Sequence, residues 1–439
     1  MTMSSTPMAL DLNREIVDAF RRREFHSSRE LREEAIHHFE KLGFPGNKNE
    51  EYRFTPITRS IEPILAVDFS EVPSSTIDDI TPYLLPGYEC NCIVLVNGLY
   101  NEKLSRIISP KDQLTVESLH RACEEKSALV QNYLGKLVDF KTDAFAAFNA
   151  AFWRDGVLIR IPSDTILDQP ILVLHIHDAG LQPVISPTRL LMIVEENSNA
   201  NLVEKFDTVG SHPVFSSWVD EIVVGERATL NYCKIQNDID STLQVASTLI
   251  HQHNASRVNS FTLTLRGKII RNNFGIAIDG ERCESHFYGL YLLDKDTLAD
   301  NHTTVDHRQP NSFTNELYKG IMSGNSKGVF NGKIYVRPHA QKTNAFQSNR
   351  NLLLSDTAVV HTKPQLEIWA DDVKCSHGCT SGQLDEEALF YLQSRGIDKT
   401  NAQALLLYAF AGEVLEAMED KPLKQYLDQI ISERLGNHF

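Results

Sequence analysis

The chain has 439 residues, 42% of them hydrophobic, and its 43 basic and 58 acidic side chains give a formal net charge of −15. This acidic balance argues against nucleic acid as a partner, because phosphate binding needs a clustered basic face. Hydrophobic segments are short and broken by charge, so none approaches the roughly 20 residues that span a bilayer. The N-terminus carries no basic or apolar signal region. We therefore expect a cytoplasmic protein without a membrane partner.

The chain contains seven cysteines, an odd number scattered along its length. Without a secretory signal, this usage indicates reduced thiols rather than a disulfide framework. We expect four of them to act as small buried apolar residues: Cys90, Cys92, Cys123 and Cys233.

Residues 1–150 are expected to form an N-terminal domain of helical and mixed character. Apolar residues recur at helical spacing from Leu31 to Leu42, and the preceding Ser27–Glu30 predicts a capping box with Ser27 as N-cap. A strand is predicted at 92–96, and another helical pattern lies near 116–134.

Helical periodicity disappears between about 158 and 369. Short runs that alternate apolar and polar residues replace it, separated by Gly, Asn, Asp and Pro, as in strands: 158–161, 171–174, 190–194, 221–224, 261–265, 274–278 and 333–336. So many strands without an intervening helix fit a sandwich, a barrel or a solenoid. We favour a β-solenoid core over 151–380, because one core spans more length than a sandwich usually holds and helical flanks at both termini can cap it.

Residues 381–439 return to helix. Asp385–Gly396 starts with an acidic turn and stops at glycine, and Thr400–Gln403 predicts a second capping box that opens an apolar helix. Pro422 begins a third helix. Apolar stripes on several faces fit either packing on the solenoid or a surface for another protein, and both interpretations stay open.

The most informative stretch, Lys363–Cys379, places a thiol, an imidazole and a thiol at alternate positions: Cys375, His377 and Cys379. Residues two apart on a strand share a face, and such donors suit zinc or iron–sulfur chemistry. Metal access then requires a position near an edge, a terminus or an interface. Lys374 and the nearby histidine are expected to lower the thiol pKa. The alternative is two buried thiols and a hydrogen-bonded core histidine. The missing fourth donor suggests that another chain completes the site.

A second group of candidate ligands comprises Cys283, His286, His302 and His307. In a solenoid such residues stack as internal ladders that satisfy their own hydrogen bonds, and this is the interpretation that we favour. Catalytic motifs are absent: isoleucine follows both Gly-Lys pairs, so there is no P-loop, and there is no nucleophile elbow, metalloprotease helix or dinucleotide fingerprint. We expect a protein that is not an enzyme and binds no nucleotide itself.

Four segments in order along the chain resemble the SufB/SufD family of iron–sulfur cluster assembly scaffolds: 49–56, 147–162, 332–355 and 363–379. The first is Asn-Glu-Glu-Tyr-Arg-Phe-Thr-Pro, and the second contains Asn-Ala-Ala-Phe followed by Asp-Gly. Lys374–Gly378 is similar to the SufD-type motif, whereas SufB-type sequences carry a glutamate-based pattern there.

The resemblance implies a right-handed parallel β-helix with helical domains at both ends. It also implies a SufB-like partner along the β-helix and a SufC-like ABC ATPase on the C-terminal helices. A transient iron–sulfur cluster or iron is shared with the partner chain, with His377 as the main ligand from this chain and Cys375 beside it. Cys379 stands where the family often has alanine, and we expect a buried small residue rather than a ligand. A homodimer of the isolated chain is left open.

Two alternatives come from other classes of protein. A β-helix enzyme acting on polysaccharides is commonly secreted and places acids and aromatics along a groove, whereas this chain lacks a signal and groups no aromatics on its strands. A zinc-dependent interaction module built on Cys375, His377 and Cys379 is the other, and one tightly held zinc per isolated chain would favour it.

Overall fold

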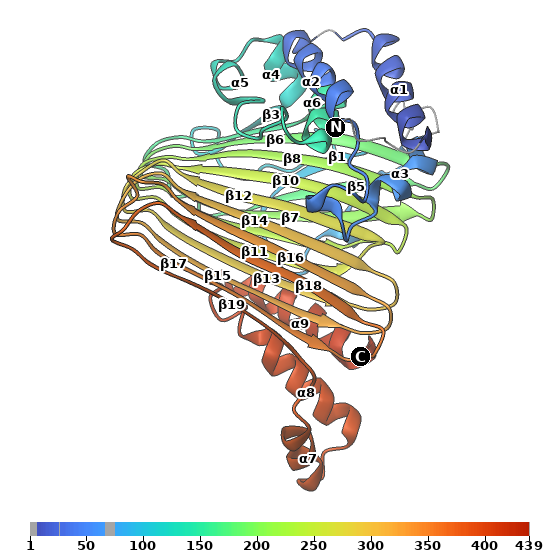
Figure 1. The fold of residues 1–439 in the computed structure, drawn as a ribbon. Helices are drawn as coiled ribbons and strands as arrows, with labels where there is room; N and C mark the ends of the chain where they lie inside the picture. The colour runs from blue at the N-terminus through green and yellow to red at the C-terminus, as the bar shows by residue number, and fades with distance from the viewer. Residues whose placement is uncertain (1–6, 26, 66–74, 439) are drawn as a thin grey trace.

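The computed structural model in Figure 1 describes residues 7–25, 27–65 and 75–438. Its core is a stack of parallel strands, β4 to β19, which alternate along the chain between two sheets. Two successive strands make one coil, and the stack forms a β-solenoid of about eight coils. The predicted fold class, mainly β with helices at both ends, is confirmed.

The strands of the solenoid are β4 (Gly156–Ile161), β5 (Ile171–Ala179), β6 (Val184–Val194), β7 (Asn199–Gly210), β8 (Val214–Val224), β9 (Thr229–Asn237), β10 (Thr242–Gln252), β11 (Arg257–Arg266), β12 (Ile269–Ile278), β13 (Glu284–Leu293), β14 (Leu298–His307), β15 (Phe313–Met322), β16 (Lys327–Val336), β17 (Asn344–Leu353), β18 (Val359–Ile368) and β19 (Lys374–Gly382). The odd-numbered strands from β5 belong to sheet A, and the even-numbered strands to sheet B. Each predicted strand run lies within one of them.

The alternation of side chains along each strand builds the core. In β9, Leu230 and Tyr232 point into the solenoid, whereas Cys233 and Ile235 point outward beneath the C-terminal helices. Register stacks equivalent positions, so that Leu202 pairs with Tyr232 in the next coil. Many strands are buried on both faces, which is why their sequences are nearly continuous apolar runs.

The first end of the solenoid is closed. Strands β1 (Asn91–Val96), β2 (Leu99–Tyr100) and β3 (Thr115–Ser118) join the sheets there, with β2 and β3 antiparallel to their neighbours. Helices α1 (Pro7–Arg21), α2 (Arg29–Leu42), α3 (Ile57–Leu65), α4 (Leu119–Glu124), α5 (Ala128–Tyr133) and α6 (Ala144–Phe152) lie above these strands and over sheet B (Figure 1). All nine residues of α6 are buried.

A buried arginine fixes the end of α6. The Arg32 guanidinium donates hydrogen bonds to Ala151 O at 3.1 Å and to Trp153 O at 2.6 Å. A cation at these carbonyls satisfies groups that a helix end leaves without partners. The closed end is therefore held by polar as well as apolar contacts.

Three helices follow β19: α7 (Glu386–Ser394), α8 (Lys399–Gly412) and α9 (Lys421–His438). Leu407 and Ala411 of α8 and Leu427 and Ile431 of α9 pack on the outer face of sheet A. Lys319 in β15 pairs with Glu413 just after α8. Helix α7 has no buried residue and extends away from the solenoid (Figure 1).

Two helix starts differ from the predicted capping boxes. The N-cap of α2 is Ser28 in a left-handed conformation without a side-chain cap, while Ser27 Oγ lies 3.1 Å from His120 Nδ1. The N-cap of α8 is Asp398 rather than Thr400. Each prediction was wrong by one or two residues, because a neighbouring polar residue or a tertiary partner took the capping position. The pattern near 116–134 splits into β3, α4 and α5.

Within the described residues, no helix is long and apolar enough to cross a membrane. The division into domains at about 150 and 380 and the cytoplasmic location stay predictions from the sequence.

Candidate functional site at the open end of the solenoid

The last coil leaves both sheets open. Strand β19 ends sheet A and β18 ends sheet B, so within the described part of the chain each has a neighbouring strand on one side only. We call these two strands the open rim. Their residues are mostly exposed or half-buried, whereas the strands two coils earlier are mainly buried. The expectation that the candidate ligands lie near an edge is met by the geometry of β19.

Cys375, His377 and Cys379 share the inward-facing side of β19. Cys375 packs half-buried against the solenoid core. The register pairs the three with Ala345, Gln347 and Asn349, all of which are buried. His377 and Cys379 are exposed because no further coil covers them. The expectation of a buried Cys379 was wrong for this reason.

The backbone of the same three residues faces the free edge. Lys374 N–H donates to Thr343 O, which directs the bonding groups of Lys374 toward β17. Bonding direction alternates along a strand, so the N–H and C=O groups of Cys375, His377 and Cys379 point the other way. The rim thus offers a strand edge and metal-binding side chains at the same residues.

The thiol of Cys375 is not activated by its neighbours. Partial burial raises the pKa of Cys375 above its usual value. The expected lowering of this thiol pKa was wrong, because Lys374 is one residue away and projects from the opposite face of the strand. A bound metal ion would have to supply the positive charge that favours the thiolate.

No three His, Cys, Asp or Glu side chains converge on a common point within 7–25, 27–65 and 75–438. Structural zinc wants four ligands from the protein. The described residues therefore form no self-contained zinc centre. One imidazole and one or two thiols on an exposed edge are a partial ligand set of a type that suits iron–sulfur chemistry.

The second group of candidate ligands does not assemble into a site. Cys283 is buried with its sulfur near Ser256, and His286 lies on the outer face of sheet A, 3.9 Å from Glu284. His307 is buried and its Nε2 is hydrogen-bonded to Thr314, but its register neighbours are Ile278 and Val336, so it does not belong to a ladder of polar side chains.

His302 belongs to a polar clamp that the sequence did not reveal. Its Nδ1 lies 3.2 Å from Glu51, and Glu51 also pairs with Lys333 at 2.7 Å. The hydrogen bonds with His302 and Lys333 lower the pKa of Glu51 to about 2, although burial acts to raise it. Tyr52 lies under the Arg271 guanidinium at 3.9 Å. Residues 49–56, one of the family segments, thus cross the outer face of sheet B.

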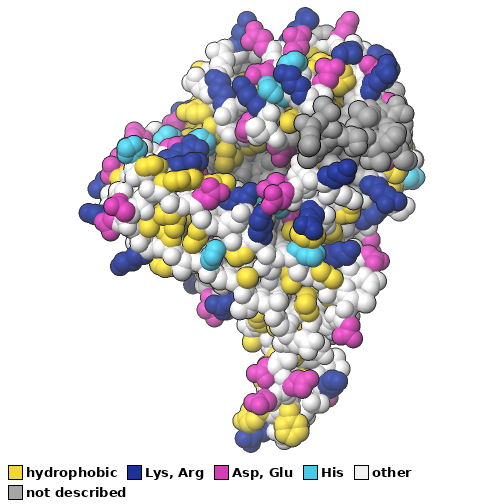
Figure 2. All heavy atoms as spheres, in the orientation of Figure 1, with side chains coloured by type: hydrophobic (Ala, Val, Ile, Leu, Met, Phe, Trp, Pro, Cys, Tyr) yellow, Lys and Arg dark blue, Asp and Glu magenta, His cyan; other side chains and the backbone are white. Residues whose placement is uncertain are grey.

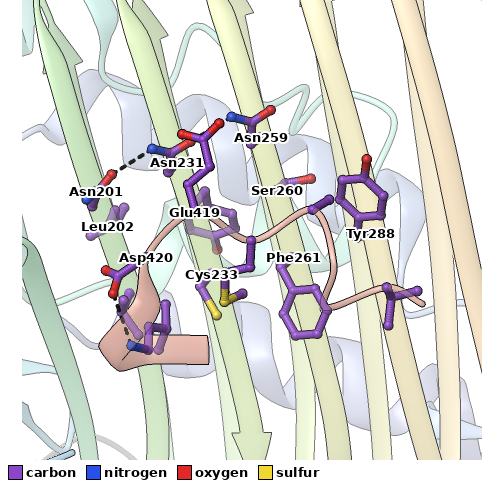
Figure 3. A pocket seen from close by; sticks show the side chains of 16 residues that line it. Asn201, Leu202, Asn231, Cys233, Asn259, Ser260, Phe261, Tyr288, Glu419 and Asp420 are labelled. Atoms are coloured by element: carbon purple, nitrogen blue, oxygen red, sulfur yellow. Dashed lines mark hydrogen bonds between the residues drawn. The ribbon is translucent and has the colours of Figure 1, made fainter. Parts of the chain in front are cut away.

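A cavity of about 670 Å³ lies beside this clamp. Among its charged lining residues, Arg271 pairs with Asp300 at 2.6 Å and Glu51 pairs with His302 and Lys333, while Asp139 and Asp143 also face the cavity. A second, apolar cavity of about 50 Å³ lies between sheet A and the α8–α9 connection. Figure 3 shows the ladder of Asn201, Asn231 and Asn259 along its strands. The smaller cavity has room for water only.

The interior of the solenoid contains buried ionisable groups that no sequence motif predicted. Glu204, Asp220 and Lys234 meet inside, and burial raises the pKa of Asp220 to about 7. Nearer the rim, burial raises the pKa of Glu316 to about 7. Only the register of the coils brings these residues together, so spacing along the sequence carries no sign of them.

Fold and site together define an elongated two-sheet β-solenoid protein whose last coil is open and carries a partial ligand set. The family comparison agrees. A model described as the SufBD core domain of SUF system FeS cluster assembly matches residues 176–410, and the SufBD N-terminal region matches 3–173. The chain belongs to the SufBD family.

Individual relatives cover most of the chain. It is 35% identical to the iron–sulfur cluster assembly protein SufD of Escherichia coli over 409 residues, 92% of each chain. It is 32% identical to a SufBD family protein of Synechocystis over 401 residues, 89% of this chain and 87% of the relative. The SufD of Bacillus subtilis is 26% identical over 330 residues, 72% of each. The resemblance predicted from four segments is confirmed.

Proposed function

We propose that this chain is a non-ATPase scaffold subunit of a Suf iron–sulfur cluster assembly complex. It pairs through the open rim with a SufB-like chain. The observation that carries the proposal is the rim itself, where β18 and β19 present unpaired edges of ten and nine residues. Such an edge is a template for pairing with another strand. Membership of the SufBD family supports this partner class.

The cargo of the complex is a nascent cluster or iron held at the seam between the two chains. His377 is the main ligand from this chain, and Cys375 lies beside it on the same face. Because the described residues supply only a partial set of donors, the partner chain completes the coordination. Cys379 is exposed on the same face, which makes it available at the seam.

A SufC-like ABC ATPase docks on the C-terminal helices in this proposal. Phe390 and Tyr391 of α7 are 73% and 56% exposed, and Leu405 of α8 is 50% exposed. Figure 2 shows hydrophobic side chains at the tip of this protruding segment. Exposed apolar groups of this kind mark contact sites. Movement of the docked ATPases would open or shear the seam and expose the ligands.

The test is cluster formation by the co-purified complex of this chain with SufB-like and SufC-like partners. His377→Ala is expected to abolish it, while the complex still assembles. His339→Ala is the matched control, since His339 is exposed in the turn between β16 and β17. Full cluster formation by the His377→Ala complex would remove His377 from the mechanism.

The other interpretations receive less support. The zinc module lacks a self-contained ligand set in the described residues. The polysaccharide-active enzyme has no counterpart in the family match. In the proposed function the chain is not an enzyme and binds no nucleotide, and the isolated chain pairs with a second copy only where the SufB-like partner is missing.

A further inference from the structure

Two buried polar side chains lie in line with His377 on the inward face of sheet A. Gln347 in β17 is the register partner of His377, and Glu316 in β15 is the register partner of Gln347. Gln347 is 3% exposed and Glu316 is 1% exposed. The three residues form a row that runs from the open rim into the solenoid, with neighbouring strands about 4.8 Å apart.

Glu316 fixes the orientation of the Gln347 amide. Gln347 Nε2 donates a hydrogen bond to Glu316 Oε2 over 2.6 Å. An unprotonated carboxyl oxygen accepts hydrogen bonds in the acid as in the carboxylate, so Glu316 Oε2 selects the NH₂ side of the amide. Gln347 Oε1 is then directed away from this bond, and it is buried without a hydrogen-bond partner among the described residues. A buried acceptor in this state gains a favourable hydrogen bond when a donor reaches it.

Gly332 in β16, on the opposite sheet, provides the space for this amide. A Cβ at Gly332 would lie 2.2 Å from Gln347 Nε2 and 2.7 Å from its Cδ. The amide is thus confined by Gly332 and hydrogen-bonded to Glu316. Along the sheet, its remaining neighbour is His377 of β19.

We propose that Gln347 is a positioning residue for His377: Gln347 Oε1 accepts one ring N–H of His377 when the other ring nitrogen binds iron or a cluster, and Glu316 holds the amide in the orientation required. This inference rests on the function proposed above. A ligating imidazole almost always donates its second N–H to an acceptor, which fixes its tautomer and orientation. The exposed ring turns inward to Gln347 on binding, and an acceptor inside the solenoid stays shielded from water.

The experiment measures how fast the co-purified complex loses ferrous iron to a chelator under anaerobic conditions. Gln347→Met keeps the length of the side chain but removes the amide, and Glu316→Leu removes its support. Both are expected to speed the loss roughly 10- to 100-fold, the usual range for a lost second partner of a ligating histidine. Glu316→Gln is the conservative rescue, because an amide oxygen also accepts from Gln347 Nε2. Its loss rate is expected to stay near that of the wild type.

Gly332→Ala supplies an independent variant, because the new methyl group would displace the Gln347 amide while both polar residues remain. We expect faster iron loss from it than from the wild type. Gel filtration of each complex and a thermal melt check that assembly and folding are kept.

The decisive readout is the combination of Gln347→Met with His377→Ala. If Gln347 acts through His377, Gln347→Met has no further effect in a complex that already carries His377→Ala. Equal effects of Gln347→Met with and without His377 would reveal a merely structural role and overturn the proposal. Unchanged iron loss in Gln347→Met, beside fast loss in His377→Ala, overturns the positioning role alone. Unchanged loss in His377→Ala overturns the proposed function and this inference with it.

Discussion

The two ends of the solenoid differ in the length and protection of their edge strands. At the first end the edge strands β2 and β3 have two and four residues, run antiparallel to their neighbours and lie near helices. At the last end β18 and β19 are ten and nine residues long and parallel to their neighbours, and no strand of the described residues pairs with their outer edges. Short edges prevent pairing with other chains, whereas long flat edges invite it.

This difference indicates that the last coil, and not the first, is the end of the solenoid that can pair with another chain. Leu114 is buried and helps to close the core at the first end, while Val360, Leu366 and Cys375 remain partly buried at the last. A solenoid requires caps at both ends, and an uncapped coil signals a cap supplied by another chain. The candidate ligands lie on that uncapped coil.

Side chains at the closed end should contribute far more to stability than side chains near the rim. Phe148 is fully buried in α6 among Phe39, Phe152 and Phe215. Phe148→Ala is expected to cost about 3–5 kcal/mol of unfolding free energy, by lost burial and a cavity. Phe346→Ala, in β17 at 37% exposure, should cost under about 1 kcal/mol. Denaturant unfolding of both variants checks this, and similar costs would contradict the contrast between the ends.

Lowering the pH should reduce the free energy of unfolding through the buried histidines of the solenoid interior. Burial lowers the pKa of His307 to about 4, against about 6.5 when unfolded. The unfolded chain therefore binds this proton first as pH falls. The contribution of neutral His307 to the free energy of unfolding is fully present above about pH 6.5. It declines by about 3 kcal/mol as the pH falls to about 4.

His307→Gln should remove this part of the pH dependence. The difference in unfolding free energy between wild type and variant, measured from pH 7 to pH 4, isolates it from the buried carboxyl groups that titrate in the opposite sense. A constant difference across this range would show that His307 is not held neutral in the folded chain.

The edge of β19 can be tested separately from its thiols. In Cys379→Pro the outward N–H is lost, a change that edge strands tolerate, and affinity for the SufB-like partner should fall roughly 10-fold. Cys379→Ser retains the N–H and should bind almost as well as the wild type. Calorimetry or surface binding measures both. Equal weakening by the two variants would implicate the thiol instead of the strand edge.

Much of this fold could be predicted from the sequence, because strand alternation and turn residues act locally. The strand runs from Leu158 to Val336 and the stop of α7 near Gly396 are examples. The helix caps at Ser28 and Asp398 were missed, since several polar residues compete within two positions. The burial of Cys379 was misjudged because no local pattern tells a last coil from an inner one.

The site could be predicted only in part. Spacing alone placed Cys375, His377 and Cys379 on one face. The row of Gln347 and Glu316 behind His377 could not be predicted from the sequence. About 30 residues of chain separate these neighbours, and only the register of the coils brings them together. Likewise, Lys374 looked close to Cys375 in sequence but projects from the opposite face.

Amide hydrogen exchange of the isolated chain and of its complex with the SufB-like partner tests most directly whether the open rim is a docking edge. In the isolated monomer, the outward amides of Cys375, His377 and Cys379 should exchange quickly. In the complex they should become strongly protected, together with β18, while the closed end is unchanged. Rapid exchange along β19 in a fully formed complex, with protection elsewhere, would contradict the account.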